Sequence, residues 1–209
     1  QIGIVQCVNL NTLETVWAAR AGDNIDGTPA LDLSEDGEEL SLYVGTTIKN
    51  KTGTPAKFHS FDALSGALNW TFEVPDLTYV SSDPVGITAS PIVGLNNVSD
   101  LVFFTATNGS SSSTMYALSK ADGSVKWSTA FTAPTESSPV AVYNEDGDAW
   151  IVQALADGQL LMLNADTGAI KATLQLDGEV RASPAVYRNV LIISTTGSDP
   201  SYIYAITLE

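Results

Sequence analysis

Side chains that could bind a cation alternate along one short acidic segment, which also contains Gly37. Calcium-binding loops place oxygen ligands at alternating positions around a glycine that allows a sharp turn. Leu40, at the ninth position of the segment, cannot act as a ligand. Asp-Gly is also common turn chemistry, so a calcium site and a plain turn both stay open. The four candidate ligands are Asp32, Ser34, Asp36 and Glu38.

Groups for catalysis are scarce. His59 is the only histidine and Cys7 the only cysteine of the sequence. A Ser-His-Asp or Cys-His centre would depend on His59 alone, and a histidine-based zinc site needs more ligands of this kind. His59 stands at the start of a predicted strand without a sequence neighbour that could act as its partner, which favours a non-catalytic histidine at a loop edge. One cysteine forms no internal disulfide and does not indicate the redox compartment.

The charge balance excludes some partners. Nine Lys and Arg stand against 24 Asp and Glu, a net charge of −15. Nucleic acids and anionic membranes are bound through basic patches, so neither is expected here. No apolar run approaches the length of a membrane span. We therefore expect a globular chain with an acidic, solvated surface.

Four Asn-x-Ser/Thr sequons point to a secretory route. Three fall in predicted loops, where an acceptor must be exposed. The fourth, Asn69, lies beside Trp70 in a predicted strand. We expect a glycoprotein of the extracellular space or the secretory lumen, with the periplasm as the alternative. The three loop acceptors are Asn50, Asn97 and Asn108.

A frame of eleven residues positions these groups. In one clear copy a strand ends at Asp122-Gly123 and the return strand carries Trp127. An Asp-Gly pair between apolar runs is a strong hairpin signal, because glycine accepts the positive φ of a tight turn. The first position of the frame is mostly small, which suits a buried role for its cysteine. The copies begin at Cys7, Ser60, Ala117, Met162 and Ala205.

Each period of the repeat contains four strands, which we label A to D. Strand A starts at a proline, B is the most apolar, C leads into the frame's turn, and D carries its tryptophan. A repeated four-stranded antiparallel unit of about 45 residues is typical of a β-propeller blade. We see no helical periodicity, so the chain is predicted to be all-β, a single propeller domain or segment over residues 1–209. The strand A prolines are Pro29, Pro91, Pro139 and Pro184.

The register begins and ends within strand C, which gives about four blade periods plus one extra strand. We expect an open arc or part of a larger propeller; a closed four-bladed ring is the alternative. The longest connections, 46–57, 75–88 and 107–114, belong to the B–C and D–A types, which emerge on the same face of an up-and-down blade. Long loops on one face of a rigid scaffold favour binding there. The candidate contact residues are Lys49, Lys51, Lys57, Asp76, Tyr79 and Asp83, although the lysines could equally be a solvated loop.

The frame A-x-[DN]-x-x-[ST]-G-x-x-x-W resembles the pyrroloquinoline-quinone-type propeller repeat of the quinoprotein family. In that family the tryptophan packs over the turn of a neighbouring blade, and an indole N–H seeks a carbonyl when it is buried. One copy has Ala172 instead, so its blade contact should be weaker. By resemblance, the docking residues are Trp17, Trp70 and Trp127, with the turn glycines Gly66, Gly123 and Gly168.

The resemblance does not extend to an active site. Quinone-dependent dehydrogenases of the family carry an adjacent cysteine pair, a bound calcium and a catalytic aspartate, on rings of about eight blades. With one cysteine, this chain has no such pair. We therefore expect no pyrroloquinoline quinone and no enzymatic activity, but a non-catalytic scaffold that presents its loop-rich face to a protein or glycan.

Two alternatives stay open. The chain could be a segment of a quinone-dependent or polysaccharide-acting enzyme. It could also be a structural subunit of an extracellular assembly, joined to other chains through its terminal strands.

Overall fold

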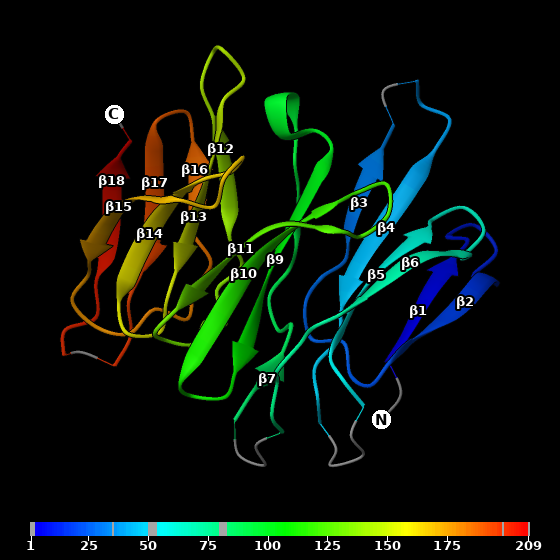
Figure 1. The fold of residues 1–209 in the computed structure, drawn as a ribbon, viewed down its shortest axis with the longest axis horizontal. Helices are drawn as coiled ribbons and strands as arrows, with labels where there is room; N and C mark the ends of the chain where they lie inside the picture. Colours follow the sequence, from blue (N-terminus) through cyan, green and yellow to red (C-terminus); the bar gives the residue numbers. More distant parts are fainter. Residues whose placement is uncertain (1–2, 35, 50–53, 80–82, 198, 209) are drawn as a thin grey trace.

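The protein forms five antiparallel sheets that follow one another in chain order (Figure 1). The computed structural model describes residues 3–34, 36–49, 54–79, 83–197 and 199–208. Within these ranges the one helical element is a 3-10 turn, η1 (Asn96–Val98). The predicted all-β architecture is confirmed.

Three complete blades occupy the middle of the chain. Blade 1 contains β3 (Ala30–Leu33), β4 (Leu40–Gly45), β5 (Lys57–Asp62) and β6 (Leu68–Glu73). Blade 2 contains β7 (Val85–Gly86), β8 (Ile92–Val93), β9 (Leu101–Asn108), β10 (Ser112–Ser119) and β11 (Val125–Phe131), and both β7 and β8 pair with β9. Blade 3 contains β12 (Val140–Tyr143), β13 (Ala149–Ala154), β14 (Gln159–Asn164) and β15 (Ile170–Gln175).

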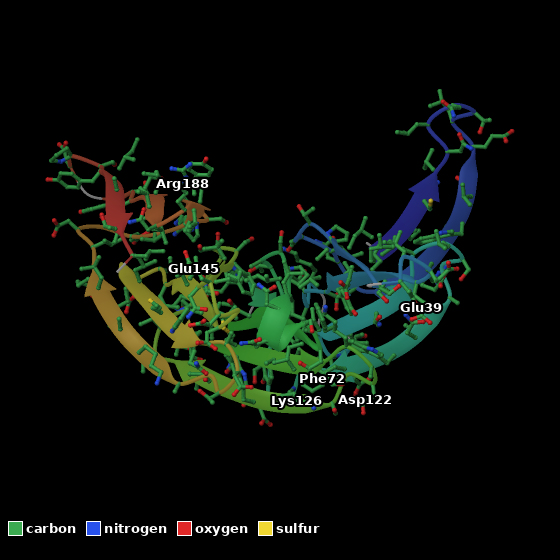
Figure 2. All side chains as sticks on the ribbon, turned by 90° about the horizontal axis from the view of Figure 1, so that it is seen from above. Glu39, Phe72, Asp122, Lys126, Glu145 and Arg188 are labelled. Atoms are coloured by element: carbon green, nitrogen blue, oxygen red, sulfur yellow. The ribbon has the colours of Figure 1, made fainter. Side chains whose placement is uncertain are left out.

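Partial sheets stand at the two ends. The N-terminal sheet is the C–D pair β1 (Gly3–Val8) and β2 (Thr15–Gly22). The C-terminal sheet has strands A to C, namely β16 (Ala185–Tyr187), β17 (Val190–Ser194) and β18 (Ile203–Thr207). Figure 2 shows an open arc with these sheets at its tips. The closed four-bladed ring is therefore wrong: β18 already occupies the edge of β17 that β1 would need.

The frame has the same backbone form in every complete C–D pair. Its first residue lies opposite the tryptophan position, as in Ser60 opposite Trp70 and Ala117 opposite Trp127, and a register shift follows at once. The turn glycine has a positive φ, +72° at Gly123. The carboxylate of Asp122 caps this turn by accepting the amide and hydroxyl hydrogens of Ser124. Residues close together in the sequence thus determine both the conformation of the turn and the register of the strand pair.

The core lies between the sheets, because each blade is buried against the next. Blades 1 and 2 share one apolar cluster that includes Phe58 and Phe104, with ring centroids 4.2 Å apart. Blades 2 and 3 share another that includes Phe103 and Ile151. Central strands such as β9 are consequently buried on both faces.

Some local predictions need correction. His59 is not at a loop edge; it lies inside β5 and is 5% exposed. The predicted loop 107–114 is mostly strand, since Asn108 pairs with Ser112 and leaves a turn of three residues. Polar Ser and Thr side chains resemble a loop in sequence, yet their backbones still complete the ladder between β9 and β10.

Candidate binding groove

Every tryptophan of the frame stands over the turn of the next blade. The indole N–H of Trp17 donates to the carbonyl of Ala63 at 3.0 Å, that of Trp70 to Lys120 at 2.8 Å, and that of Trp127 to Ala165 at 2.9 Å. The geometry is the docking that the resemblance implied.

The turn glycines make room for these rings. A Cβ on Gly66 would lie 2.6 Å from the Trp17 ring, and one on Gly168 would lie 2.5 Å from Trp127. Gly123 meets Trp70 in the same way, at 2.6 Å. A side chain at these positions would therefore displace the indole, so the glycine and the tryptophan form one contact.

A second set of contacts joins the strand A starts. The amide of Thr28 donates to the hydroxyl oxygen of Ser90 at 3.0 Å, the amide of Ser90 to Ser138 at 3.0 Å, and the amide of Ser138 to Ser183 at 2.9 Å. Each bond crosses from one sheet to the next. We call this set of bonds the serine ladder. Neighbouring sheets are therefore joined at two places, by the tryptophan contacts and by the serine ladder.

The B–C and D–A connections lie on one face, as predicted. Ile48 donates its amide to Val85, and Gly109 donates to Pro84. At the next junction Ala156 donates to Pro134. These backbone bonds tie the connections of neighbouring blades into a common surface, which we call the loop face.

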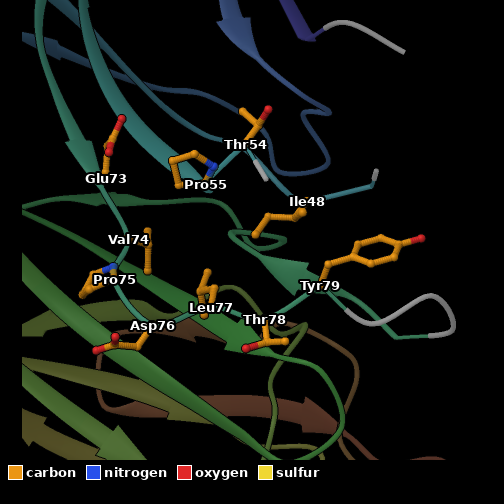
Figure 3. A pocket seen from close by; sticks show the side chains of 10 residues that line it. All are labelled: Ile48, Thr54, Pro55, Glu73, Val74, Pro75, Asp76, Leu77, Thr78 and Tyr79. Carbon is orange, nitrogen blue, oxygen red and sulfur yellow. The ribbon is translucent and has the colours of Figure 1, made fainter. Parts of the chain in front are cut away.

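The loop face contains a groove of about 660 Å³ beside blade 1 (Figure 3). It lies where the connection after β4 meets the connection after β6. Apolar side chains make most of its lining and two carboxylates stand at its margin. The lining residues are Ile48, Thr54, Pro55, Glu73, Val74, Pro75, Asp76, Leu77, Thr78 and Tyr79.

The apolar lining is in part rigid. Ile48 and Val74 are 6% and 3% exposed and belong to the core cluster between blades 1 and 2. Leu77 and Tyr79 are half-buried and pack against that cluster. The base of the groove therefore rests on the blade core.

Negative charge dominates the margin. Glu73 pairs with Lys57 across 2.9 Å, at the strand ends of β6 and β5. Asp76 is exposed, and its charge is a secondary cause of the raised pKa of Tyr116, after burial of that phenol. The groove thus combines an apolar base with an acidic rim.

The predicted contact residues do not form one site. Asp76 and Tyr79 line the groove, whereas Asp83 lines a smaller hollow with Thr107 and Arg181. Lys49 pairs with Asp26 at 3.2 Å, away from the partner of Lys57. The lysines are therefore separately paired, and Lys51 lies outside the described residues.

Eight of the ten groove residues were not among the predicted contact residues, and three of these eight are apolar residues that belong to the core or pack against it, namely Ile48, Val74 and Leu77. The available signal was an apolar residue within an otherwise polar connection, as at Ile48 between Thr47 and Lys49. Such a residue usually packs inward, and only the fold shows that these three also line a surface hollow.

The acidic segment forms a turn. Asp32 pairs with Lys120 of blade 2 at 2.9 Å. Asp36 accepts hydrogen bonds from the Ser34 hydroxyl and the Glu38 amide, which lower the pKa of its carboxyl. Within the described ranges, no group of three or more His, Cys, Asp or Glu side chains could hold a metal ion. Asp32 thus joins blade 1 to blade 2, and Ser34 and Asp36 stabilise the turn.

Two of the predicted loop acceptors, Asn97 and Asn108, contact neighbouring segments. Asn97 is exposed in η1, and its side-chain amide donates to the carbonyl of Asp146 and the carboxylate of Asp148, both at 3.2 Å. Asn108 is half-buried at the end of β9, and its side-chain oxygen accepts the amide of Thr78 at 3.4 Å. Asn50 lies outside the described residues.

His59 has a structural environment. Its Nε2–H donates to the carbonyl of Ala21 at 2.6 Å, so its Nδ1 accepts from the hydroxyl of Thr71 at 2.8 Å. Burial lowers the pKa of the ring, with Lys57 adding to the shift and the Ala21 bond opposing it. The histidine therefore ties β5 to the N-terminal sheet.

Among curated proteins, the sequence matches short parts of much longer chains. A stretch of 102 residues is 33% identical to the mouse beta-alanine-activating enzyme, over 48% of this chain and 9% of that protein. The zebrafish counterpart is 29% identical over 140 residues, 65% of this chain and 11% of that protein. The chain thus spans about a tenth of the length of these relatives. No protein-family model matches.

Solved structures share the fold. BamB from Moraxella catarrhalis superposes with a TM-score of 0.67 at 19% identity, over 99% of this chain and 56% of that one. Sqt1 from Saccharomyces cerevisiae gives 0.70 at 13%, over 98% and 52%. BBS1N, solved in complex with ARL6DN, gives 0.63 at 15%, over 99% and 59%.

Enzymes occur among these neighbours as well. The quinohemoprotein alcohol dehydrogenase from Comamonas testosteroni superposes with a TM-score of 0.61 at 15% identity, over 93% of this chain and 38% of that one. At such identities the likeness shows the fold alone, which is that of a β-propeller. No helix in the described part of the chain is long and apolar enough to cross a membrane.

Proposed function

We propose that this chain is a non-catalytic, protein-binding propeller segment that docks an extended peptide of a partner in the groove of its loop face. The observation that carries the proposal is the groove itself, an apolar hollow of about 660 Å³ on a preformed base. Its lining from Ile48 to Tyr79 offers contact area for apolar side chains, and a rigid site limits the entropy cost of binding.

Charge defines the partner further. The exposed Asp76 and the acidic chain as a whole favour a segment in which a Lys or Arg stands near the apolar anchors. Complementary charge would raise the association rate and disfavour acidic competitors.

The comparisons support a binding role. BBS1N was solved in complex with another protein, and it superposes over nearly all of this chain. The enzyme neighbours support the rival that this chain is part of a dehydrogenase-like or other enzyme. We favour the scaffold because His59 is held between a carbonyl and a hydroxyl, a structural arrangement.

A peptide library tests the groove. Panning displayed random dodecapeptides against the chain should enrich sequences with apolar anchors and a basic residue. The Leu77→Asp variant should reduce their affinity at least tenfold, because it places a charge among the apolar contacts. Tyr79→Ala, a milder change, should also weaken binding.

Leu64→Asp is the matched control. Leu64 is 63% exposed on a C–D turn, so the same substitution there leaves the groove intact. Peptides that bind wild type, L77D and L64D equally would refute the groove as the site, as would a library without enrichment.

We also propose an extracellular or secretory-lumen location, with the exposed Asn97 as an acceptor. Intact-mass measurement of the native protein before and after glycosidase treatment tests this. A loss of glycan mass that disappears in Asn97→Gln supports it, and an unmodified mass contradicts it.

The terminal sheets support a second candidate, an assembly subunit. Their outer faces expose Ile4 and Val16 at one tip and Tyr187 and Ile203 at the other, between 55% and 78%. In the described residues β18 has no strand on its outer side. Concentration-dependent assembly in light scattering, abolished by Ile203→Asp, would favour this role; a strict monomer would remove it.

A further inference from the structure

Blade 3 and the C-terminal sheet meet at a junction where the docking tryptophan is replaced by Ala172. An apolar slot of about 230 Å³ lies beside this residue, walled by both sheets. We propose that this slot is a binding site for a small planar aromatic ring with an N–H donor, of the indole class. The proposal is independent of the groove.

The repeat itself identifies the occupant. At the three preceding junctions the same place in the frame holds an indole, supplied by Trp17, Trp70 or Trp127. The backbone around Ala172 keeps the same form, since it lies opposite Met162 and a register shift follows, as at Ala117 opposite Trp127. The strand pairing around Ala172 is therefore that of the earlier junctions, while the side chain is smaller.

One wall of the slot can be compared directly with the surroundings of Trp127. Phe103 lies opposite Ala117 and contacts the Trp127 ring at 5.8 Å; the corresponding residue opposite Met162 is Val152. At the junction between blade 3 and the C-terminal sheet, the residue at the tryptophan position and the residue beside it are therefore both smaller. Met162 is larger than Ala117, yet the slot remains.

A polar partner is also in place. The three indole N–H groups donate to the residue three positions after the start of the next frame, as Trp127 does to Ala165. Counting from Ala205, the equivalent residue is Leu208, which lines the slot. Its carbonyl would accept the N–H of a bound ring, while Leu160, Leu174 and Ile206 provide apolar contact.

Access and energetics suit a small ligand. Ala172 is exposed on the outer strand β15, so a ring can enter from solvent. Apolar cavities of comparable size bind small aromatic molecules, because water gains little from filling them. The retained shape also reduces the cost of ordering the site.

The test uses 5-fluoroindole, followed by fluorine NMR, and indole, followed by the shift in melting temperature. Wild type should show saturable binding with a dissociation constant in the micromolar to millimolar range. Indene, which has the same shape without the N–H, should bind about threefold to tenfold more weakly, the effect of one hydrogen bond. Equal binding of indole and indene would refute the assigned polar partner.

Ala172→Trp should fill the slot and reduce binding at least tenfold. If it does not fold, Ala172→Leu, which places a smaller apolar side chain in the same slot, provides a second blocked variant. Trp127→Ala is the positive control, since it opens an equivalent slot at the junction before. Two results would overturn the proposal: either wild type fails to bind while W127A binds, or wild type and A172W bind equally. If W127A is unfolded, the comparison of wild type with the blocked variant decides.

Discussion

The junction between blades 2 and 3 and the junction between blade 3 and the C-terminal sheet have the same strand pairing around residues 127 and 172, but different side chains. The first is closed by Trp127, which is 9% exposed and bonded to Ala165. The second has Ala172, and every residue of β15 is exposed. Turn chemistry and register therefore do not depend on the tryptophan, whereas the packing between sheets does.

The largest effect is expected from Trp127→Ala. Removing this ring should cost about 3–5 kcal/mol of unfolding free energy, the usual range for a buried Trp truncated to Ala. Urea denaturation followed by circular dichroism measures it. Trp150→Ala is the control, because Trp150 is half-buried and carries no docking bond, so its loss should be smaller. Equal losses of unfolding free energy would mean that Trp127 contributes no more to stability than Trp150.

Gly123→Ala tests the turn glycine that makes room for a docking tryptophan. Gly123 has φ +72°, and a Cβ there would meet the Trp70 ring at 2.6 Å. Gly37→Ala is the matched control, since Gly37 has φ +76° with nothing within 4 Å. Backbone strain alone should cost about 1–2 kcal/mol in G37A. G123A should lose about 1–3 kcal/mol more through the displaced ring. Indistinguishable unfolding curves for the two variants would contradict this contact.

Ala172→Trp tests the same comparison from the other side, because it adds the missing indole to the junction between blade 3 and the C-terminal sheet. Filling the slot should stabilise the chain by about 0.5–2 kcal/mol, as cavity-filling substitutions commonly do. Thermal unfolding measures the gain. Ala18→Trp, on an exposed position of β2, is the control that adds the same ring without a slot. A neutral or destabilised A172W would show that this junction has repacked around alanine.

The junction between the N-terminal sheet and blade 1 should alone respond to pH near neutrality. Burial lowers the pKa of His59 below its ordinary 6.5, so between the folded value and 6.5 the unfolded chain binds more protons. Stability is then complete above about pH 7.5 and is lost as the pH falls through 6.5 towards the folded pKa.

This effect should be the smallest of the series. Urea unfolding at successive pH values measures it, and His59→Gln should be flat over the same window because the sequence has no other histidine. A pH dependence that persists in H59Q would assign it to other groups.

Much of the fold could be predicted because it rests on local chemistry. Each turn glycine and the strand that follows it depend on contacts within about ten residues, so the frame at Ser60 or Ala117 could be found by inspection. The role of Trp70 also followed, since a buried indole needs a carbonyl partner. The serine ladder did not, although its Ser-Pro motifs were visible, because its bonds join residues 45 to 62 positions apart.

The candidate site was predicted only in part. Tyr79 and Asp76 lie in connections that looked suited to binding, and they line the groove. Lys49 and Lys57 looked alike in sequence, yet each has its own carboxylate partner, brought close by the pairing of strands. Ile48 was missed because burial and surface exposure of an apolar residue depend on what lies across from it.

The sequence by itself determined the repeat, the strand order and the phase in which the chain begins and ends in strand C. These follow from turn geometry and alternation, which act between near neighbours. Tertiary structure alone decided that the sheets form an open arc, that His59 is buried, and that Ala172 borders a slot of about 230 Å³. Each of these depends on the distance between sheets, and that distance is set by side chains far apart in the chain that meet only when the blades pack.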